Sequence, residues 1–281
     1  MFKFFVFLFI VLIMIMGIVG AAFALGLGDF VAVADGNSNV INNPAGLAEL
    51  QGKSLNLEHR LMDRDVANLL FWYDDLLVYN APGQPGYGAL FLVYNQDQTG
   101  DFEYQHVINC GYGYGWSAFQ NISLGISGRY VNFSIDSTFT GSLYTENGLL
   151  FDFGILVKLF ERCQLGISVK NGLRTQALSH FGLKTITGIS YQISGQVISA
   201  EIDDLLNQQG QLIYRVGGRL TLFSNWKVHI VLENGVVNHQ GMLYGLEYLA
   251  TKHLELGLWQ YFVQSEEARA NVFQAAVGYR F

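Results

Sequence analysis

The stretch Trp226–Glu233, which reads WKVHIVLE, alternates between apolar and polar side chains at every position except Val231. A β-strand directs successive side chains to opposite faces, so such alternation predicts a strand with one apolar and one polar face. The expected apolar face consists of Trp226, Val228, Ile230 and Leu232. The expected polar face carries Lys227, His229 and Glu233.

The same period of two recurs in both directions from this stretch, for example along Phe151–Lys158 and Leu165–Lys170. Glycine, asparagine, aspartate and serine separate the alternating segments, as they do between short strands. Fourteen strands are expected, near residues 54–61, 67–79, 86–95, 103–116, 122–133, 148–159, 164–171, 184–193, 196–203, 212–222, 226–233, 241–249, 252–262 and 271–281. Twelve strands remain an alternative, because Ser54–Asn80 allows more than one division.

The composition indicates where the apolar faces are buried. The chain is 51% hydrophobic and only 14% charged, against about 25% charged residues in an ordinary soluble domain. After Leu25 no apolar run reaches the roughly 20 residues that a membrane helix needs. Only helices and closed barrels satisfy all backbone polar groups in lipid. The sequence therefore predicts an all-β fold, a transmembrane antiparallel β-barrel in the cell outer membrane.

The amino terminus resembles an export signal. Lys3 precedes an apolar run from Phe4 to about Gly20, and Ala22-Phe23-Ala24 fits the small-x-small pattern of signal peptidase sites. We expect cleavage after Ala24, which divides the chain into a signal peptide (1–24), an amino-terminal plug segment (25–50) and the barrel (51–281). An uncleaved signal anchor is the alternative.

Connection lengths indicate which way the barrel is inserted. Bacterial barrels have long outer loops and short periplasmic turns. The expected outer loops are Ser134–Asn147, Gly172–Leu183, Asp204–Gln211, Asn234–Gln240 and Val263–Ala270, and the expected turns are Phe160–Cys163, Ser194–Gly195, Ser224–Asn225 and Ala250–Thr251. This alternation is expected of a membrane barrel and not of a soluble β-sandwich.

The last strand carries a further signal. The apolar or aromatic residues Phe273, Ala275, Val277, Tyr279 and Phe281 alternate with Gln274, Gly278 and Arg280, and the sequence ends on Phe281. This pattern resembles the signal that the outer-membrane barrel-assembly machinery recognises, so Tyr279 and Phe281 are the expected assembly signal. Aromatic rings prefer the lipid headgroup region. The expected aromatic belt is Trp116, Trp226, Tyr114, Tyr248, Tyr279 and Phe281.

Residues 25–50 contain the stretch Asn42-Asn43-Pro44-Ala45-Gly46-Leu47-Ala48, preceded by Ala34-Asp35-Gly36-Asn37. Asn43 can cap a short helix that has Pro44 at its first position. The stretch resembles the amino-terminal plug of the FadL-like outer-membrane superfamily, and more closely its PorV/PorQ-type branch. The resemblance extends over most of the mature chain, as a recurring pattern of similar strand segments. It implies a fourteen-stranded barrel closed by its own amino terminus, with plug residues Asp29, Asp35, Asn43, Pro44, Ala45 and Gly46.

Charged side chains are expected on the inner face of the barrel. They are Arg129, Asp152, Lys158, Lys170, Glu201, Arg215, Arg219, Lys227, Glu233, Glu247 and Glu255. One interpretation is a polar lining or a latch that holds the plug, and the other is mutual neutralisation, which buried charges require. The glycines Gly111, Gly113 and Gly115 would let another segment approach the wall closely, and we expect the plug backbone there.

The sequence contains no pattern of an enzyme or a cofactor site. Six histidines occur singly, without metal-ligand spacing, and no hydrolase or phosphate-loop motif is present. Cys110 and Cys163 lie on non-neighbouring expected strands, which favours free thiols over a disulfide. Without Lys3 the net charge is 15 − 23 = −8, which argues against a nucleic-acid partner.

Two functions follow from these expectations. The first is passage or binding of a hydrophobic small molecule past the plug. The second is a non-transporting scaffold or secretion-system component, as the PorV-type resemblance implies. An open porin is a third hypothesis, disfavoured because the plug would block an aqueous channel. The expected partners are outer-membrane lipid, the barrel-assembly machinery, and either a hydrophobic ligand or a secretion-system protein.

Overall fold

The structure is a computed structural model of the whole chain. It describes residues 32, 39–50, 52–65, 72–82, 86–98, 103–137, 141–175, 178, 181–193, 196–205, 211–235, 240–264 and 269–281. Among these residues, no helix is both long enough and apolar enough to cross a bilayer.

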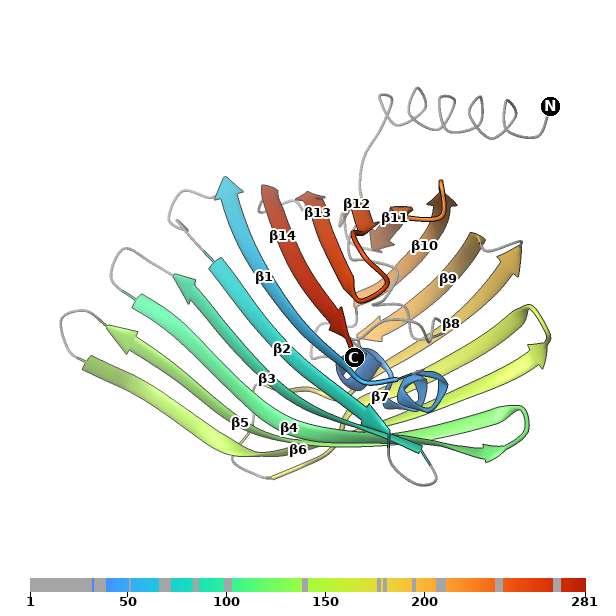
Figure 1. The fold of residues 1–281 in the computed structure, drawn as a ribbon. Coiled ribbons are helices and arrows are strands. Elements are labelled where there is room, and N and C mark those ends of the chain that lie inside the picture. Colours follow the sequence, from blue (N-terminus) through green and yellow to red (C-terminus); the bar gives the residue numbers. More distant parts are fainter. Residues whose placement is uncertain are drawn as a thin grey trace.

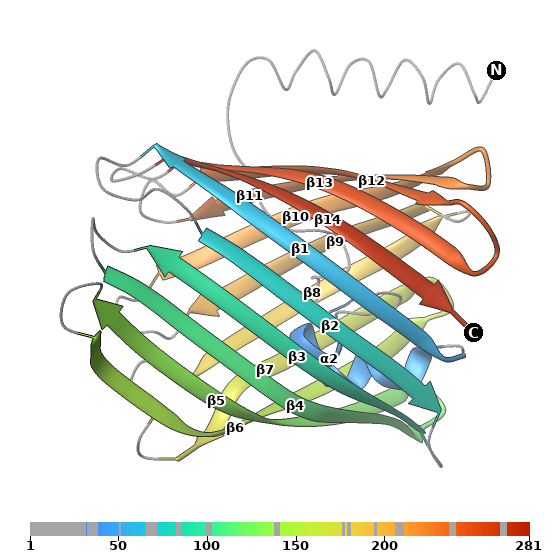
Figure 2. The same cartoon turned by 60° about the vertical axis from the view of Figure 1, so that its left-hand side comes forward.

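The described strands form one closed antiparallel barrel of fourteen, in which each strand pairs with its neighbours in sequence and β14 pairs with β1 (Figures 1 and 2). The strands are β1 (Ser54–Asp65), β2 (Trp72–Pro82), β3 (Gly86–Gln98), β4 (Glu103–Phe119), β5 (Ile122–Ser137), β6 (Gly141–Phe160), β7 (Cys163–Arg174), β8 (Lys184–Ile193), β9 (Gln196–Leu205), β10 (Gln211–Leu222), β11 (Trp226–Gly235), β12 (Gln240–Leu249), β13 (Leu254–Gln264) and β14 (Arg269–Arg280). Closure leaves no unpaired sheet edge.

The predicted number of strands is confirmed, and the twelve-strand alternative is wrong. The ambiguous region divides into β1 and β2, whose register runs from Ser54 opposite Asn80 to Met62 opposite Trp72. The start predicted for β2, residues 67–71, lies outside the described residues.

The predicted alternation of faces is confirmed on β11. His229, Val231 and Glu233 are buried, whereas Leu232 is exposed. Buried positions on β11 face the lumen, and exposed apolar positions cover the outer surface. Leu90, Ile126, Ile155, Ile189, Val216, Leu258 and Val277 lie on that surface as well. An apolar outer band of this kind is what a bilayer requires of a barrel.

The two rims of the barrel differ in their connections. We call the rim that holds Ser54, Arg280 and the turns 120–121, 161–162 and 223–225 the turn rim, and the opposite one the loop rim. The longest connection at the loop rim joins β7 to β8 through residues 175–183.

One predicted outer loop is wrong. Most of Ser134–Asn147 is paired strand, because β5 continues to Ser137 and β6 begins at Gly141. A register shift follows Ile135, and Gly141 has a positive φ of 77°, which glycine adopts without strain. The irregularity disturbs the sequence alternation although pairing continues. The other predicted loops differ from the observed connections by a few residues at their ends.

Two short helical elements lie inside the barrel. They are α2 (Asn39–Asn42) and the 3-10 helix η3 (Pro44–Glu49), and together we call them the amino-terminal turn unit. Figure 2 shows α2 behind the strands of the barrel wall. The unit contacts β3, β4, β5 and β6.

Candidate functional site in the barrel lumen

Asn43 begins η3 and also joins it to the wall. Its side-chain oxygen accepts a hydrogen bond from the backbone N–H of Ala45 at 3.2 Å, and Pro44 occupies the first turn. The amide nitrogen Nδ2 donates to the carbonyl oxygen of Ile155 on β6 at 3.2 Å. An asparagine at this position stabilises the start of a helix by about 1 kcal/mol relative to alanine. Asn43, Pro44, Ala45 and Gly46 are all buried.

Three glycines on neighbouring strands form the floor beneath this turn. Gly115, Gly125 and Gly154 lie opposite one another in the register of β4, β5 and β6. A Cβ added at Gly125 would lie 2.1 Å from the carbonyl carbon of Pro44. At Gly115 it would lie 2.5 Å from the Pro44 oxygen, and at Gly154 it would lie 2.0 Å from Asn43 Oδ1. The wall is therefore shaped to accept the turn unit at backbone distance.

Of Gly111, Gly113 and Gly115, which were expected to face the plug backbone, two face the turn unit and one does not. A Cβ at Gly113 would lie 2.4 Å from Val40 Cγ2, so Gly113 and Gly115 both face the turn unit. The nearest atoms to such a Cβ at Gly111 belong to the wall itself. Sequence reasoning missed Gly125 and Gly154, whose role depends on the strand register.

Charges and apolar contacts complete the attachment. Glu49, at the end of η3, forms an ion pair with Lys158 and accepts a 2.8 Å hydrogen bond from Ser123 Oγ. Val40 and Leu47 are fully buried against the inner face of β3. Full burial of a valine or leucine side chain contributes about 1.5–3 kcal/mol. Glu49 was not among the predicted site residues, because nothing in the sequence places it opposite Lys158.

A second contact holds the amino-terminal region farther round the barrel. Ser190 Oγ on β8 donates a buried 2.7 Å hydrogen bond to the carbonyl oxygen of Ala32. The predicted plug residues Asp29 and Asp35 lie outside the described residues.

The inner wall next to the turn unit carries a buried polar network. Arg129 on β5 forms a 3.1 Å ion pair with Asp152 on β6. Asp152 also accepts the backbone N–H of Asn171 at 2.7 Å, and Arg129 Nη2 donates to Asn171 Oδ1. Ser127 lies 3.4 Å from the same carboxylate. Asp152 is 1% exposed, and a carboxylate so deeply buried needs such partners.

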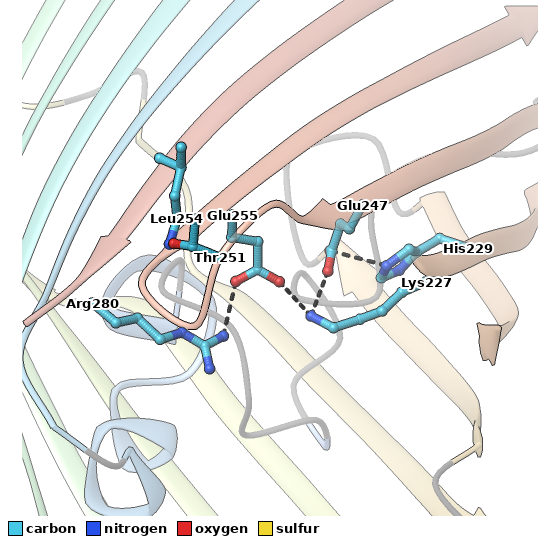
Figure 3. Close-up of polar contacts among 7 residues, drawn as sticks. All are labelled: Lys227, His229, Glu247, Thr251, Leu254, Glu255 and Arg280. Carbon is cyan, nitrogen blue, oxygen red and sulfur yellow. Dashed lines mark hydrogen bonds and ion pairs between the residues drawn. The ribbon is translucent and has the colours of Figure 1, made fainter. Parts of the chain in front are cut away.

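A charge ladder crosses β11, β12, β13 and β14 near the turn rim (Figure 3). Lys227 Nζ lies 2.6 Å from Glu247 Oε2 and 2.5 Å from Glu255 Oε1. Arg280 on β14 pairs with the other oxygen of Glu255 at 2.8 Å. Two cations face two carboxylates, so the ladder balances its own charge.

His229 on β11 lies next to Glu247, at the end of the ladder opposite Arg280. Its Nε2 is 2.9 Å from Glu247 Oε1, although the ring N–H direction falls outside hydrogen-bond geometry. The contact is an ion pair only when the imidazole is protonated. The ring also meets Trp259 edge to face, with centroids 6.4 Å apart. A Cβ at Gly245 or Gly257 would collide with Trp259 at 1.8 and 2.0 Å, so the indole lies against two glycines.

The remaining predicted charges lie at separate places. Arg215 and Glu233 form a buried 2.7 Å pair between β10 and β11. Lys170 is buried on β7, and Arg219 is half-buried on β10. Glu201 lies opposite Arg215 in the register of β9 and β10, and its side chain lies outside the description. The predicted set thus divides into several local pairs and does not form one site.

Apolar clusters interrupt this polar lining. Val131 and Leu150 form one with Leu178 of the β7–β8 connection. Val197, Val231 and Leu243 form another, with Trp259 and Tyr261 packed against it. No group of three or more His, Cys, Asp or Glu side chains in the described parts of the chain could hold a metal ion.

Aromatic side chains gather near the turn rim. Trp226 and Tyr248 pack with ring centroids 4.4 Å apart, and Tyr114 stacks on Trp116 at 5.9 Å. Tyr279 meets Phe281 edge to face at 5.1 Å. The backbone N–H of Phe281 donates to Lys53 O at 3.0 Å, which extends the β14–β1 seam to the last residue. Cys110 is exposed and Cys163 is half-buried, and both are free thiols.

The fold is shared with known channels. The Pseudomonas putida toluene transporter TodX matches with a TM-score of 0.70 and 14% identity, over 92% of this chain and 99% of that one. The Ralstonia pickettii toluene transporter TbuX matches with a TM-score of 0.68 and 11% identity, over 93% and 95%. A Pseudomonas aeruginosa FadL homologue matches with a TM-score of 0.66 and 10% identity, over 93% and 100%. No protein-family model and no curated protein matches the sequence. At these identities the likeness shows the fold alone, a FadL-like β-barrel.

Proposed function

We propose that this chain is an outer-membrane barrel that binds hydrophobic small molecules or lets them pass, with residues 25–50 as a plug. The observation that carries the proposal is the apolar character of parts of the inner wall. Val131 and Leu150 on one wall, and Val231 and Leu243 on another, are buried inward-facing side chains. The lumen of an aqueous porin is polar instead. The likeness to two toluene transporters supports the same class of ligand.

The arrangement of the turn unit supports closure against free aqueous flow. A segment seated on glycines and held by Glu49 and Lys158 occupies space near the turn rim. Val40 and Leu47 of the turn unit pack closely on apolar side chains of the wall. The ion pair between Glu49 and Lys158 is partly exposed. A passage along the remaining lumen would therefore favour hydrophobic small molecules over polar ones.

Uptake by whole cells tests the proposal, because the lipopolysaccharide leaflet slows apolar molecules whereas simple vesicles do not. Cells with and without the chain would be compared for initial uptake of radiolabelled toluene, with a labelled sugar as the polar control. We expect faster toluene uptake and unchanged sugar uptake. Equal toluene uptake, together with no apolar compound in extracts of protein purified in mild detergent, would refute the proposal.

A scaffold of the PorV/PorQ type is the second candidate function. It is favoured by the short connections at the loop rim, where β5 and β6 are joined by residues 138–140. Such a rim offers little loop surface for capturing ligands, and it leaves the barrel wall accessible to a neighbouring protein. Crosslinking in intact outer membranes should then give one reproducible protein adduct. Recovery of the monomer alone would contradict this candidate.

We also propose that residues 1–24 are a signal peptide and that the mature chain begins at Leu25. Intact-mass measurement of protein extracted from outer membranes is the test. Retention of the first 24 residues would favour the signal-anchor alternative.

A further inference from the structure

The described residues of the connection between β7 and β8, which are 175, 178 and 181–183, lie against the inside of the barrel wall. Leu178, in the middle of this connection, is fully buried and packs on the inward-facing Val131 and Leu150. Phe181 packs against the same cluster and meets Phe133 of β5 edge to face at 6.4 Å. An ordinary outer loop projects into water, whereas Leu178 and Phe181 of this connection cover part of the inner wall.

Polar contacts hold the connection in that position. Arg174, the last residue of β7, donates from Nη1 to the carbonyl oxygens of Phe181 at 2.7 Å and Leu178 at 3.3 Å. Asn171 Nδ2 donates to Gly182 O at 2.8 Å. Irregular backbone that turns inward must find partners for its carbonyl groups. Arg174 and Asn171 supply them, and hydrogen bonds from a charged donor are the stronger kind.

The wall is shaped for the connection. A Cβ at Gly148 would lie 2.0 Å from Thr175 Oγ1 and 3.1 Å from Leu178 Cγ, so only glycine leaves room there. The backbone N–H of Thr175 donates to the carbonyl oxygen of Leu149 at 3.1 Å, and the Thr175 hydroxyl oxygen accepts a hydrogen bond from the N–H of Leu149 at 3.2 Å.

A bulge in β7 redirects the chain just before the connection. Phe151 lies opposite Leu173 and Phe153 opposite Val169, so residues 170–172 together face the single Asp152. Asn171 has a φ of 54°, in the left-handed region that asparagine adopts more readily than most residues other than glycine, and Asp152 accepts a hydrogen bond from its N–H. Bulges of this kind re-aim a strand and its side chains.

We propose that Leu178 and Phe181 of the β7–β8 connection, held against the inner wall by Arg174, form a constriction of the lumen that selects apolar molecules by size. This inference rests on the proposed function. The turn unit narrows the lumen near the turn rim, and the connection narrows it on the loop-rim side of the same β5–β6 wall. Arg174 is a positioning residue in this scheme, and Leu178 anchors the connection to the wall.

Coverage of the wall is tested by cysteine labelling, which does not depend on transport. Val131→Cys is introduced into the full chain with Cys110→Ser and Cys163→Ser, and its reaction with a small water-soluble maleimide is followed. We expect Arg174→Gln to accelerate labelling at least about tenfold, because two hydrogen bonds from a charged group are lost. With Arg174→Lys, the labelling rate should lie between the rates measured with Arg174 and with Arg174→Gln. Leu173→Ala, at an outward-facing exposed position, should leave the labelling rate unchanged.

Selection is tested by comparing uptake of toluene with uptake of a bulkier hydrocarbon such as triisopropylbenzene. Arg174→Gln with Leu178→Ala should raise the bulky-to-small uptake ratio severalfold. Rapid labelling of Val131→Cys with Arg174 in place would overturn the proposed coverage. Faster labelling with an unchanged ratio would overturn size selection. If no chain carries either hydrocarbon, the proposed function itself fails, and size selection fails with it.

Discussion

The glycines beneath the amino-terminal turn unit determine how closely it approaches the wall. In Gly125→Ala, the new methyl group would lie 2.1 Å from the Pro44 carbonyl carbon, closer than atoms can pack. We expect the unit to shift and hydrogen exchange in residues 39–50 to accelerate, with the barrel intact. Gly218→Ala is the matched control, because its nearest atom would lie at 3.7 Å. Equal exchange in the two variants would show that the glycine floor does not seat the unit.

The buried pair of Arg215 and Glu233 makes a second prediction for single residues. Arg215→Met removes the cation that lies 2.7 Å from the carboxylate of Glu233, a residue that is only 2% exposed. Loss of one partner of a buried ion pair typically costs about 3–5 kcal/mol, whereas apolar replacement of both is often neutral. We therefore expect a large fall in the free energy of unfolding for Arg215→Met and recovery in Arg215→Met with Glu233→Leu. Denaturant titration in lipid vesicles measures both. A double variant no more stable than the single one would contradict this reasoning.

Strand β6 tests the membrane placement of a whole element. Ile155 and Leu159 both point outward, Ile155 in the apolar band and Leu159 beside the turn rim. Arginine on a lipid-facing position costs about 2–4 kcal/mol at the bilayer midplane and about 0–1 kcal/mol near the interface. Ile155→Arg should therefore lower the free energy of unfolding in vesicles by more than Leu159→Arg. Equal effects would place β6 at another depth.

Strand β14 carries the expected assembly signal. Phe281 is 66% exposed and contributes little packing, so its replacement should leave the folded barrel nearly as stable. We expect Phe281→Ser to reduce the amount of folded barrel in cells, seen as the heat-modifiable band on gels. Refolding into detergent in vitro should be almost unchanged. Phe223→Ser, at an exposed turn of the same rim, is the control. A similar loss in both variants would indicate a general effect of removing a rim aromatic.

The elements show what the sequence could and could not predict. Strands such as β11 were predictable because alternation depends only on neighbouring residues, and His229 and Glu233 face inward as expected. The paired residues around Gly141 were missed, since a register shift breaks the alternation while pairing continues. The glycine floor was predicted at Gly115 but not at Gly125 or Gly154, because their alignment arises from pairing between strands. The same reason hid Glu49, whose partner Lys158 is remote in sequence.

At the scale of the whole molecule, the lumen is asymmetric. The turn unit and the β7–β8 connection both lie on the wall formed by β5 and β6. Across β11 to β14, the described inner contacts include the charge ladder and the cluster against which Trp259 packs. The ladder joins strands only within the last four, so it stabilises the sheet beside the β14–β1 seam. The wall that carries the inserted segments and the wall that completes closure are therefore different parts of the barrel.

This asymmetry leads to a prediction about conductance. The mature chain should conduct ions poorly in planar bilayers, because the amino-terminal region is bound at Ala32 to β8 and at residues 39–50 to β3–β6. Deletion of residues 25–50 removes contacts on both sides and should raise the conductance, while Gly125→Ala should give brief openings of similar size. Circular dichroism and heat-modifiability confirm that each barrel is folded. If the folded deletion variant conducts no better than the mature chain, residues 25–50 do not limit ion flow through the barrel.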